Sequence, residues 1–316
     1  MISICIPVYN FHVYNLVAEL QKQANNINAK YEIICIDDFS DSDCVSANNN
    51  ILDFPCVNYI KLRENIGRSK IRNLLAEKAN YKNLLFIDCD SEIIKDDYLE
   101  KFINTDKQEI VKTLLDSNLT GRGGAGFPTG MKWDYCSKAP SEKKYVICNA
   151  DEGDSGAYSD RYLLEDQALK VIFGMVICGY VIGGDEGVLY IRGEYPKSIE
   201  SLNASINSLK KDGLLGENIL GTNFSFDLNI CIGQGAYICG EETALIASIE
   251  GRRAEVDVRP PFPVTEGLYK KPTVVNNVET LAAATGILIN GADKFSAIGN
   301  KKSAGTKLVC FDSFFN

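Results

Sequence analysis

Apolar and polar residues alternate along the N-terminal third of the chain in a way that predicts strands and helices in turn. Short apolar runs at 2–7, 32–37, 57–62 and 83–88 are typical of buried strands. Apolar residues at helical spacing lie between these runs, most clearly at 67–79. Strands that alternate with helices predict a parallel α/β sheet, and ligands of such sheets gather at the carboxyl ends of the strands.

The remaining two thirds continue the same alternation. Apolar residues at helical spacing predict a helix over 107–119, and either Thr105 with Gln108 or Asp106 with Glu109 can form a capping box at its start. The further elements expected are strands at 145–148, 187–195 and 226–232 and helices at 162–181, 195–211 and 241–249. The fold class is therefore α/β throughout.

A glycine-rich loop follows the helix expected at 107–119. Five of the thirteen residues from Gly121 to Trp133 are glycine. A loop without Cβ atoms can bring several backbone N–H groups close to one anion, so this loop is a candidate phosphate site. Gly121, Gly123 and Gly126 fit the G-x-G-x-x-G spacing, but a helix and not a strand precedes them, so the ordinary dinucleotide fingerprint is not met. A glycine-rich surface turn is the alternative.

Composition and charge narrow the possible functions. The 316 residues are 45% hydrophobic and 24% charged, which is ordinary for a folded protein of one or two domains. The formal net charge of −9 argues against a nucleic-acid partner or an anionic membrane surface, because both require a basic face. No segment reaches the roughly 18 consecutive apolar residues that a membrane span needs.

The cysteines and the single histidine do not form a recognisable metal site. None of the 11 cysteines forms a C-x-x-C pair, so the usual spacing of zinc and iron–sulfur sites is missing. Without a signal peptide, the cysteines are expected to be reduced thiols in the cytoplasm. His12 is expected early in a helix, with a structural role, and multi-histidine metal sites are excluded.

Acidic pairs follow two of the expected strands. Asp37 and Asp38 close the strand at 32–37, and Asp88 and Asp90 close the strand at 83–88. The spacing of an Asp-x-Asp pair leaves both carboxylates free to point toward a metal ion. Such a pair suits Mg²⁺ or Mn²⁺ carrying a diphosphate. The alternative is that these acids cap the helices that follow.

The N-terminal third resembles the nucleotide-binding half of a family 2 (GT-A) glycosyltransferase. The resemblance lies in four segments, at 2–10, 33–41, 65–73 and 84–90. It implies that Asp38 contacts the base of a nucleotide-sugar, that Arg72 touches the diphosphate, and that Asp88 and Asp90 hold the metal. The resemblance stops near residue 104, before the half that carries the catalytic base in that family, so sugar transfer is not expected.

From residue 105 onward the chain resembles the NADH-binding flavoprotein subunit of respiratory complex I, a family shared with NAD(P)-linked hydrogenases. The resemblance rests on the glycine loop and on six motifs, at 148–156, 160–165, 190–195, 235–245, 260–263 and 276–280. It implies an NADH dehydrogenase that binds FMN, transfers a hydride from NADH to FMN, and passes electrons to an iron–sulfur partner subunit. No catalytic acid or base from the protein is required.

The same resemblance assigns site residues. It implies FMN contacts from Gly121, Arg122, Gly123, Gly126, Lys132, Asn149, Asp151, Glu152, Tyr237, Gly240, Glu241, Asn276, Asn277 and Thr280. It implies NADH contacts from Phe127, Lys132, Tyr135, Asp154, Glu242 and Phe262. The three aromatic rings would stack on the adenine. A carboxylate at Glu242 would bind the ribose hydroxyls and repel a 2′-phosphate, which favours NADH over NADPH. Glu241 and Glu242 are expected in one helical turn with diverging side chains, so only one should face a given ligand.

The predicted organisation therefore has three parts. A truncated GT-A, Rossmann-like half over 1–104 is followed by an α/β FMN- and NADH-binding domain over 105–304 and by the start of a truncated ubiquitin-like domain over 305–316. The family's [4Fe–4S] cluster is not expected in this chain. No linker separates the first two parts, so a composite chain with neither activity intact is a further hypothesis. The expected location is the cytoplasm, peripheral on the inner face of the membrane through partner subunits.

Overall fold

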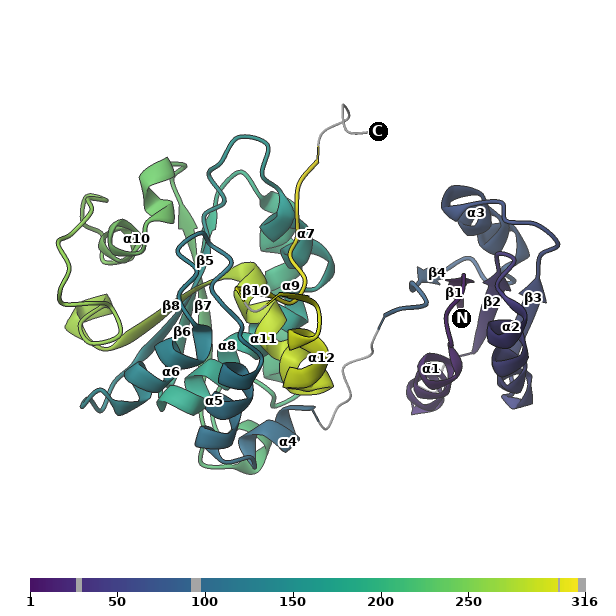
Figure 1. Ribbon diagram of the computed structural model, residues 1–316, viewed down its shortest axis with the longest axis horizontal. Coiled ribbons are helices and arrows are strands. Elements are labelled where there is room, and N and C mark those ends of the chain that lie inside the picture. Colours follow the sequence, from purple (N-terminus) through teal and green to yellow (C-terminus); the bar gives the residue numbers. More distant parts are fainter. Residues whose placement is uncertain (27–29, 92–97, 301, 312–316) are drawn as a thin grey trace. The chain divides into compact units, whose positions relative to one another are not determined.

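The computed structural model describes residues 1–26, 30–91, 98–300 and 302–311. The chain divides into two compact units, Met1–Lys95 and Asp96–Asn316 (Figure 1). No helix among the described residues has the length and apolar character that crossing a bilayer would demand. Of the segment expected to begin a ubiquitin-like domain, residues 312–316 lie outside the described residues.

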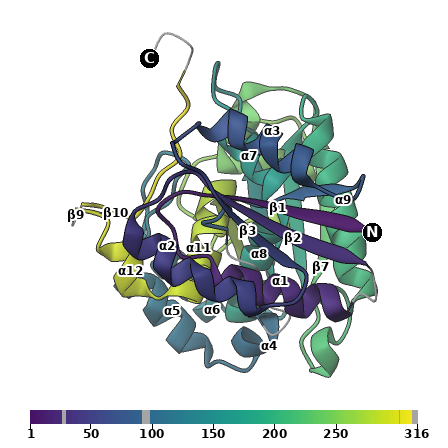
Figure 2. The same cartoon turned by 90° about the vertical axis from the view of Figure 1, so that its right-hand side faces the viewer.

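The first unit is built on a parallel sheet. Its strands are β1 (Ile2–Val8), β2 (Tyr31–Asp37), β3 (Val57–Lys61) and β4 (Leu84–Phe86), in the order β3-β2-β1-β4. Its helices are α1 (Tyr14–Asn26), α2 (Ser42–Asn48), the 3₁₀ turn η1 (Asn49–Asp53) and α3 (Arg68–Lys78). All four strands lie where the apolar runs predict them. β1 and β2 read as continuous apolar runs because helices cover both faces of the sheet (Figure 2).

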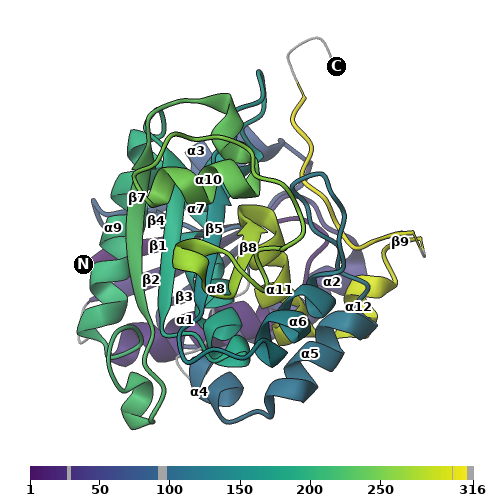
Figure 3. The ribbon, with the colours of Figure 1, turned by 90° about the vertical axis from the view of Figure 1, so that its left-hand side faces the viewer.

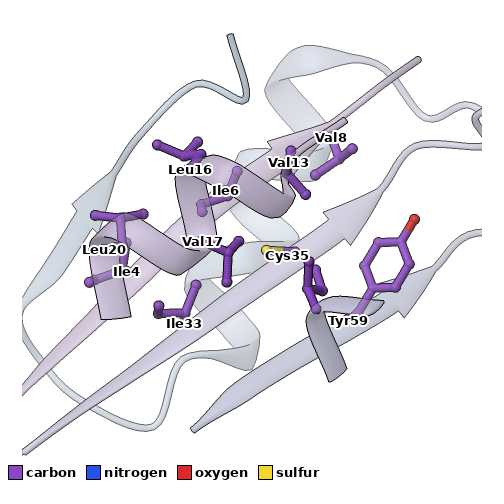
Figure 4. Packing of buried hydrophobic residues seen from close by; sticks show 11 residues of the cluster. Ile4, Ile6, Val8, Val13, Leu16, Val17, Leu20, Ile33, Cys35 and Tyr59 are labelled. Atoms are coloured by element: carbon purple, nitrogen blue, oxygen red, sulfur yellow. The ribbon is translucent and has the colours of Figure 1, made fainter. Parts of the chain in front are cut away.

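Two apolar layers hold this sheet. On one face, Ile4 and Ile6 of β1 pack with Val17 and Leu20 of α1 (Figure 4). On the other face, Cys5 and Ile34 pack with Ile71 and Leu75 of α3. Alternate residues of each strand therefore enter different cores, as the two-residue period of a strand requires.

His12 is not part of a helix, which corrects the expectation from the sequence. Residues 11–13 precede α1 as a loop, and His12 is exposed. Buried Asn48 holds this loop, since its Oδ1 accepts from Val13 N at 2.9 Å and its Nδ2 donates to Phe11 O at 2.8 Å. These bonds satisfy backbone groups that would otherwise belong to a first helical turn.

The second unit contains another parallel sheet, in the order β7-β6-β5-β8. Its strands are β5 (Tyr145–Ala150), β6 (Glu186–Arg192), β7 (Asp227–Gly233) and β8 (Thr273–Asn277), and a short hairpin joins β9 (Gly299–Asn300) and β10 (Ser303–Ala304). Its α-helices are α4 (Tyr98–Ile103), α5 (Lys107–Asp116), α6 (Thr129–Lys138), α7 (Ser159–Asp166), α8 (Ala168–Ile182), α9 (Pro196–Lys211), α10 (Glu242–Ile249), α11 (Val278–Asn290) and α12 (Ala292–Ser296). Its 3₁₀ turns are η2 (Ile219–Gly221), η3 (Tyr237–Gly240) and η4 (Leu268–Lys270).

Helices cover both faces of this second sheet. Figures 1 and 3 show α10 on one side of the strands and α8 with α11 on the other. On the α10 side, Tyr145, Ile147 and Val188 of the sheet pack with Leu245 of α10. On the other side, α8 lies so close to α11 that a Cβ atom on Gly174 would stand 2.5 Å from Leu281 O.

Two helix boundaries refine the sequence prediction. Asp106 is the N-cap of α5 and accepts from Gln108 N at 2.8 Å and from Glu109 N at 3.3 Å, so the second of the two capping alternatives holds. The single helix expected over 162–181 is wrong. Gln167 leaves helical geometry, with φ −134° and ψ 34°, and separates α7 from the almost entirely buried α8.

Candidate functional site

A cavity of about 530 Å³ opens in the second unit, where the glycine loop meets the carboxyl ends of β5 and β8. This volume is within the range of small-molecule and cofactor sites. Fourteen of the residues singled out from the sequence line the cavity: Gly121, Gly123, Gly126, Phe127, Lys132, Tyr135, Asn149, Gly240, Glu241, Glu242, Phe262, Asn276, Asn277 and Thr280. The structure thus brings together residues that lie up to about 160 positions apart in the sequence.

The glycine loop is closed on itself and pinned to the start of α11. Gly121 N donates to Phe127 O at 2.9 Å, which closes the loop. Gly126 has a φ of +65°, a conformation that favours glycine. Arg122 N donates to Thr280 Oγ1 at 2.9 Å, and a Cβ atom on Gly123 would stand 3.2 Å from Asn277 Cβ. Loop and helix N-terminus therefore converge on one side of the cavity, where an anion would find backbone donors.

The first turn of α11 is capped by a cavity-lining side chain. Asn277 Oδ1 accepts from Glu279 N at 2.9 Å and from Thr280 N at 3.4 Å. Buried Trp133 of α6 donates its indole N–H to Asn276 Oδ1 at 2.9 Å. Lys132 Nζ, from the same helix, donates to Val275 O at 3.0 Å. The helix that follows the glycine loop thus positions the end of β8.

Arg122 is not among the cavity-lining residues, but its backbone N–H bonds to cavity-lining Thr280. Its guanidinium is buried, with a side-chain exposure of 2%, and its Nη2 donates to Ala304 O at 2.8 Å and to Thr306 O at 3.1 Å. It also lies over the ring of Phe295, 5.8 Å from the centroid. The side chain therefore ties residues 304–306 to the glycine loop, a role that the sequence pattern did not indicate.

The acidic side chains of the turn after β5 have different surroundings. Glu152 accepts from Ser159 Oγ at 3.0 Å and from Asp160 N at 3.2 Å, so it caps α7. Asp154 is exposed and accepts from the Tyr237 hydroxyl at 3.0 Å. Neither of these acids nor Tyr237, which is 70% exposed, is among the cavity-lining residues.

Asp151 has a buried oxygen beside the cavity that finds no partner in the described part of the chain. Its Oδ2 has no hydrogen-bond partner there, and a Cβ atom on cavity-lining Gly240 would stand 3.9 Å from it. Burial raises the pKa of this carboxyl. A buried polar atom without a partner is costly, so Asp151 fits a ligand that brings a hydrogen-bond donor to this point.

Both glutamates at the start of α10 line the cavity, and which of them faces a given ligand stays a prediction. Glu241 is the N-cap, with extended backbone angles of −78° and 134°, and its Oε2 accepts from Thr243 N at 2.8 Å. Glu242 is the first helical residue. Because Glu241 is not helical, the two side chains do not diverge as neighbours within a helix do.

Arg259 is a cavity residue that sequence reasoning missed. Its Nη1 lies 2.7 Å from Glu242 Oε1 and its Nη2 lies 3.4 Å from Glu241 Oε1. Lys132 Nζ lies 3.8 Å from Glu242 Oε2. Two cations and two carboxylates thus share one wall of the cavity. The sequence did offer one indication of this role, because Arg259 directly precedes the Pro-Pro-Phe-Pro motif at 260–263.

Three aromatic rings present apolar surface at the cavity. Phe127, Tyr135 and Phe262 all line it and are 42%, 48% and 54% exposed. The ring centroids of Phe127 and Tyr135 are 6.5 Å apart. Exposed rings beside a cavity are available to stack on a planar ligand, whereas buried rings are not.

In the first unit, the acidic residues at the strand ends are engaged by other parts of the chain. Buried Asp38 accepts from Ile66 N at 2.7 Å and from Gly67 N at 3.0 Å. Asp88 accepts from Arg68 Nη2 at 2.9 Å and from Arg72 Nη2 at 2.5 Å. The expectation of two free carboxylates in the Asp-x-Asp pair therefore fails for Asp88.

The electrostatics of Asp88 follow from these contacts. Burial raises the pKa of Asp88, but Arg72 and Arg68 outweigh burial and hold the pKa below its ordinary value. Asp90 is exposed in the turn that follows. Over residues 1–26, 30–91, 98–300 and 302–311, no three His, Cys, Asp or Glu side chains are grouped as a metal site requires.

The parallel sheet, the glycine loop at a helix N-terminus and the cavity lined by charged and aromatic side chains define the second unit as a nucleotide-cofactor-binding α/β protein. The family model of the Nuo51 FMN-binding domain matches residues 114–285, more than half of the chain. The chain belongs to this family. A second model, glycosyl transferase family 2, matches residues 3–123. Both resemblances read from the sequence are confirmed.

Several known proteins are similar to this chain. The NAD-reducing hydrogenase HoxS subunit alpha of Cupriavidus necator is 53% identical over 203 residues, which cover 64% of this chain and 34% of that protein. A subunit of the NADH-quinone oxidoreductase of Aquifex aeolicus is 45% identical over 239 residues, which cover 75% and 55%. A crystal structure of an NAD⁺-reducing [NiFe]-hydrogenase in the H₂-reduced state superimposes with a TM-score of 0.63 at 39% identity, over 68% of this chain and 36% of that chain. The chain thus spans about a third to a half of the relatives that it matches.

Proposed function

We propose that residues 105–304 form a domain that binds FMN and oxidises NADH. The observation that carries this proposal is the convergence of the glycine loop and the N-terminus of α11 on a cavity beside the unpartnered Oδ2 of Asp151. The family match and the printed names of the relatives, which are subunits of NAD-reducing hydrogenases and NADH-quinone oxidoreductases, support it.

The residues present suit the FMN phosphate and its polar chain. Thr280 Oγ1 accepts from Arg122 N, which leaves the hydroxyl hydrogen of Thr280 to donate. Backbone N–H groups of the glycine loop and the dipole of α11 favour a dianion at the same place. Asp151 would accept from a hydroxyl of the ribityl chain. Gly123 and Gly240 leave space for the ligand. A Cβ atom on Gly123 would approach Asn277, and one on Gly240 would approach Asp151.

Other aromatic and charged side chains that line the same cavity suit NADH. Phe127, Tyr135 and Phe262 would hold the adenine by stacking. Glu242 would accept from the ribose hydroxyls, and Arg259 and Lys132 would face the diphosphate. FMN, when bound, supplies the hydride acceptor for NADH. The chain itself would orient the two cofactors and supply charged groups around them. Asp154, which is hydrogen-bonded to Tyr237, would lie near the nicotinamide.

The partner that we propose is an iron–sulfur subunit of a complex I-like or hydrogenase-like assembly. The support is that the similar proteins are named as subunits of such enzymes. We place the protein in the cytoplasm, where it would attach to the inner face of a membrane only through its partners. The partner subunit, and not this chain, would determine which group accepts the electrons.

The absorbance spectrum of the whole chain, reconstituted with FMN under anaerobic conditions, tests the proposal. We expect the bands of bound flavin after gel filtration, and bleaching of these bands on addition of NADH. Flavin that passes through the column unbound would overturn the proposal. Flavin that binds and does not bleach would leave an FMN-binding protein without NADH oxidation.

A second candidate function belongs to the first unit. Asp38 and Asp88 follow the carboxyl ends of β2 and β4, where a parallel sheet binds ligands, and Asp88 pairs there with Arg68 and Arg72. The glycosyl transferase family 2 model covers this region. We propose that it binds a nucleotide-sugar, with exposed Asp90 as the carboxylate left for Mg²⁺ or Mn²⁺. Binding of UDP that depends on Mn²⁺ and is lost in Asp90→Ala is expected. UDP binding without any dependence on the metal would contradict the metal assignment.

A further inference from the structure

Asp160 is a buried carboxyl directly behind the cavity wall. It lies in the first turn of α7 and is 6% exposed. Its Oδ2 accepts from Asn277 Nδ2 at 2.8 Å. Asn277 itself lines the cavity and caps α11. Asp160 is therefore one side chain removed from the place that we assign to the FMN phosphate.

The contact decides which way the Asn277 amide points. With Nδ2 turned toward Asp160, Oδ1 faces the N–H groups of Glu279 and Thr280 and completes the cap. The opposite orientation would place Nδ2 against two backbone donors and would take away the N–H that Asp160 Oδ2 accepts. Asp160 therefore positions Asn277, and through it the first turn of α11.

The surroundings of Asp160 are acidic. Glu152, from the turn after β5, and Glu279, from α11, are the carboxylates that act on it. Buried Cys148 of β5 and Tyr195, which precedes α9, are further titratable neighbours. Arg122 Nε lies 3.9 Å from Glu279 Oε1, so this cation pairs with Glu279. Among the residues that the structure describes, no lysine or arginine side chain is bonded to or paired with Asp160.

A buried carboxylate without a cation is strongly disfavoured relative to its neutral form. Burial first, and then the Glu152 carboxylate, raise the pKa of Asp160 to about 8. Burial in these acidic surroundings therefore favours the neutral carboxylic acid. It can accept from Asn277 in either protonation state, so ionisation changes the charge at this point and leaves the hydrogen bond in place.

We propose that Asp160 is a positioning residue for the FMN phosphate, which orients Asn277 at the start of α11 and must be a neutral carboxylic acid for the phosphate to bind tightly. This inference rests on the proposed FMN site. Ionised Asp160 would set a negative charge behind Asn277, next to a dianionic phosphate, in surroundings that screen charge poorly. Release of the proton and binding of FMN would therefore oppose each other.

The size of the effect follows from linkage. One proton that must be retained on binding changes the dissociation constant by at most about tenfold per pH unit above the pKa of the free site. We expect the FMN dissociation constant of the whole chain to be constant near pH 7 and to rise up to about tenfold by about pH 9. Riboflavin, which lacks the phosphate, should show no such rise.

Flavin fluorescence titrations over this pH range, with FMN and with riboflavin, make the test. Asp160→Asn keeps the acceptor oxygen without the charge, so its FMN affinity should be independent of pH and within about twofold of the unmodified chain at pH 7. Asp166→Asn is the matched control, because Asp166 is an exposed acid at the other end of α7 and its variant should keep the pH dependence.

The outcomes separate this inference from the proposed function. A rise that persists in Asp160→Asn, an equal rise with riboflavin, or FMN binding that does not change with pH would each overturn the inference and leave the FMN site standing. Absence of FMN binding at every pH would overturn both. If Asp160→Asn does not fold, the comparison of FMN with riboflavin in the unmodified chain decides the question.

Discussion

Arg259 Nη1 lies 2.7 Å from Glu242 Oε1, so the carboxylate that we assign to the NADH ribose is paired with a cation from the loop before the Pro-Pro-Phe-Pro motif. The pair is partly exposed, with side-chain exposures of 38% and 23%. Its contribution to folding is therefore small, and its importance lies in how the two charges are presented to a dinucleotide.

Arg259→Ala should weaken NADH binding more than it weakens folding. Among the described residues, the variant leaves Glu242 paired with Lys132 and Glu241 without a paired cation, so a diphosphate would meet a more negative wall. We expect the KM for NADH to rise about tenfold, most strongly at low ionic strength where charges are least screened. Arg253→Ala, at a side chain that is 89% exposed, is the control. A KM equal to that of the control would refute the role of Arg259.

Glu242→Ala should change the choice between NADH and NADPH. Loss of a hydrogen bond from a ribose hydroxyl to a charged acceptor, about 1.5 to 3 kcal/mol, corresponds to a tenfold to hundredfold weaker NADH interaction. The 2′-phosphate of NADPH would no longer meet this carboxylate, so the preference for NADH in kcat/KM should shrink. Steady-state kinetics with both nucleotides measure the ratio, with the exposed Glu255→Ala as control. An unchanged ratio would remove Glu242 from the ribose site.

Asp151→Asn should act in opposite directions on folding and on FMN binding. Without flavin, the variant removes a buried carboxyl whose pKa is raised by burial, so the Tm of the flavin-free chain should be equal or higher at neutral pH. With flavin, it replaces one acceptor oxygen by an NH₂ group, and FMN affinity should fall about tenfold. Thermal unfolding and flavin titration together test this pair of effects. A lower Tm without flavin would show that Asp151 has a structural partner instead.

The stability of the second unit should fall as pH rises from about 6 to about 9. Asp160 has a pKa of about 8 in the folded chain, above its ordinary value of about 3.9, so in this window the folded state binds more protons than the unfolded state. Its contribution to stability is therefore present at low pH and is lost as pH rises toward the folded pKa. Trp133, the single tryptophan and fully buried, reports urea unfolding of this unit.

Asp160→Asn should flatten that dependence and be the more stable chain near pH 9. Asp166→Asn should keep the slope of the unmodified chain. A slope that Asp160→Asn leaves unchanged would assign the pH dependence to other groups.

Two glycines in the neighbouring helices α8 and α11 should respond to alanine with opposite signs. A Cβ atom on Gly174 would stand 2.5 Å from Leu281 O, so Gly174→Ala should force the helices apart and cost about 1 to 3 kcal/mol. At Gly286 of α11 nothing lies within 4 Å of the added Cβ, so Gly286→Ala should stabilise the unit by up to about 1 kcal/mol. Urea unfolding followed by Trp133 fluorescence measures both. Equal effects would contradict the close packing of α8 on α11.

The sequence was a good guide to elements whose signal is local. The strands β1 to β7 and the start of α5 near Asp106 follow from apolar runs and short-range spacing, and the glycine loop from its composition, whereas β8 was not predicted. The break at Gln167 was missed because 162–181 is mostly apolar and no proline or glycine marks the boundary between α7 and α8. Likewise, the loop at His12 depends on Asn48, whose side chain lies 35 positions from Val13 and has no signal in the local pattern.

By itself, the sequence determined the α/β class, the two family resemblances and most of the residues around the cavity, because motifs and periodicity are properties of short segments. The tertiary structure alone decided what each side chain does there. The side chain of Arg122 bonds to Ala304 and Thr306, that of Glu152 caps α7, and Arg259 lines the cavity. Buried Asp160 meets Asn277 across 117 positions of sequence. Such contacts depend on how strands and helices pack in three dimensions. This packing decides which partner each side chain meets and whether the side chain is buried.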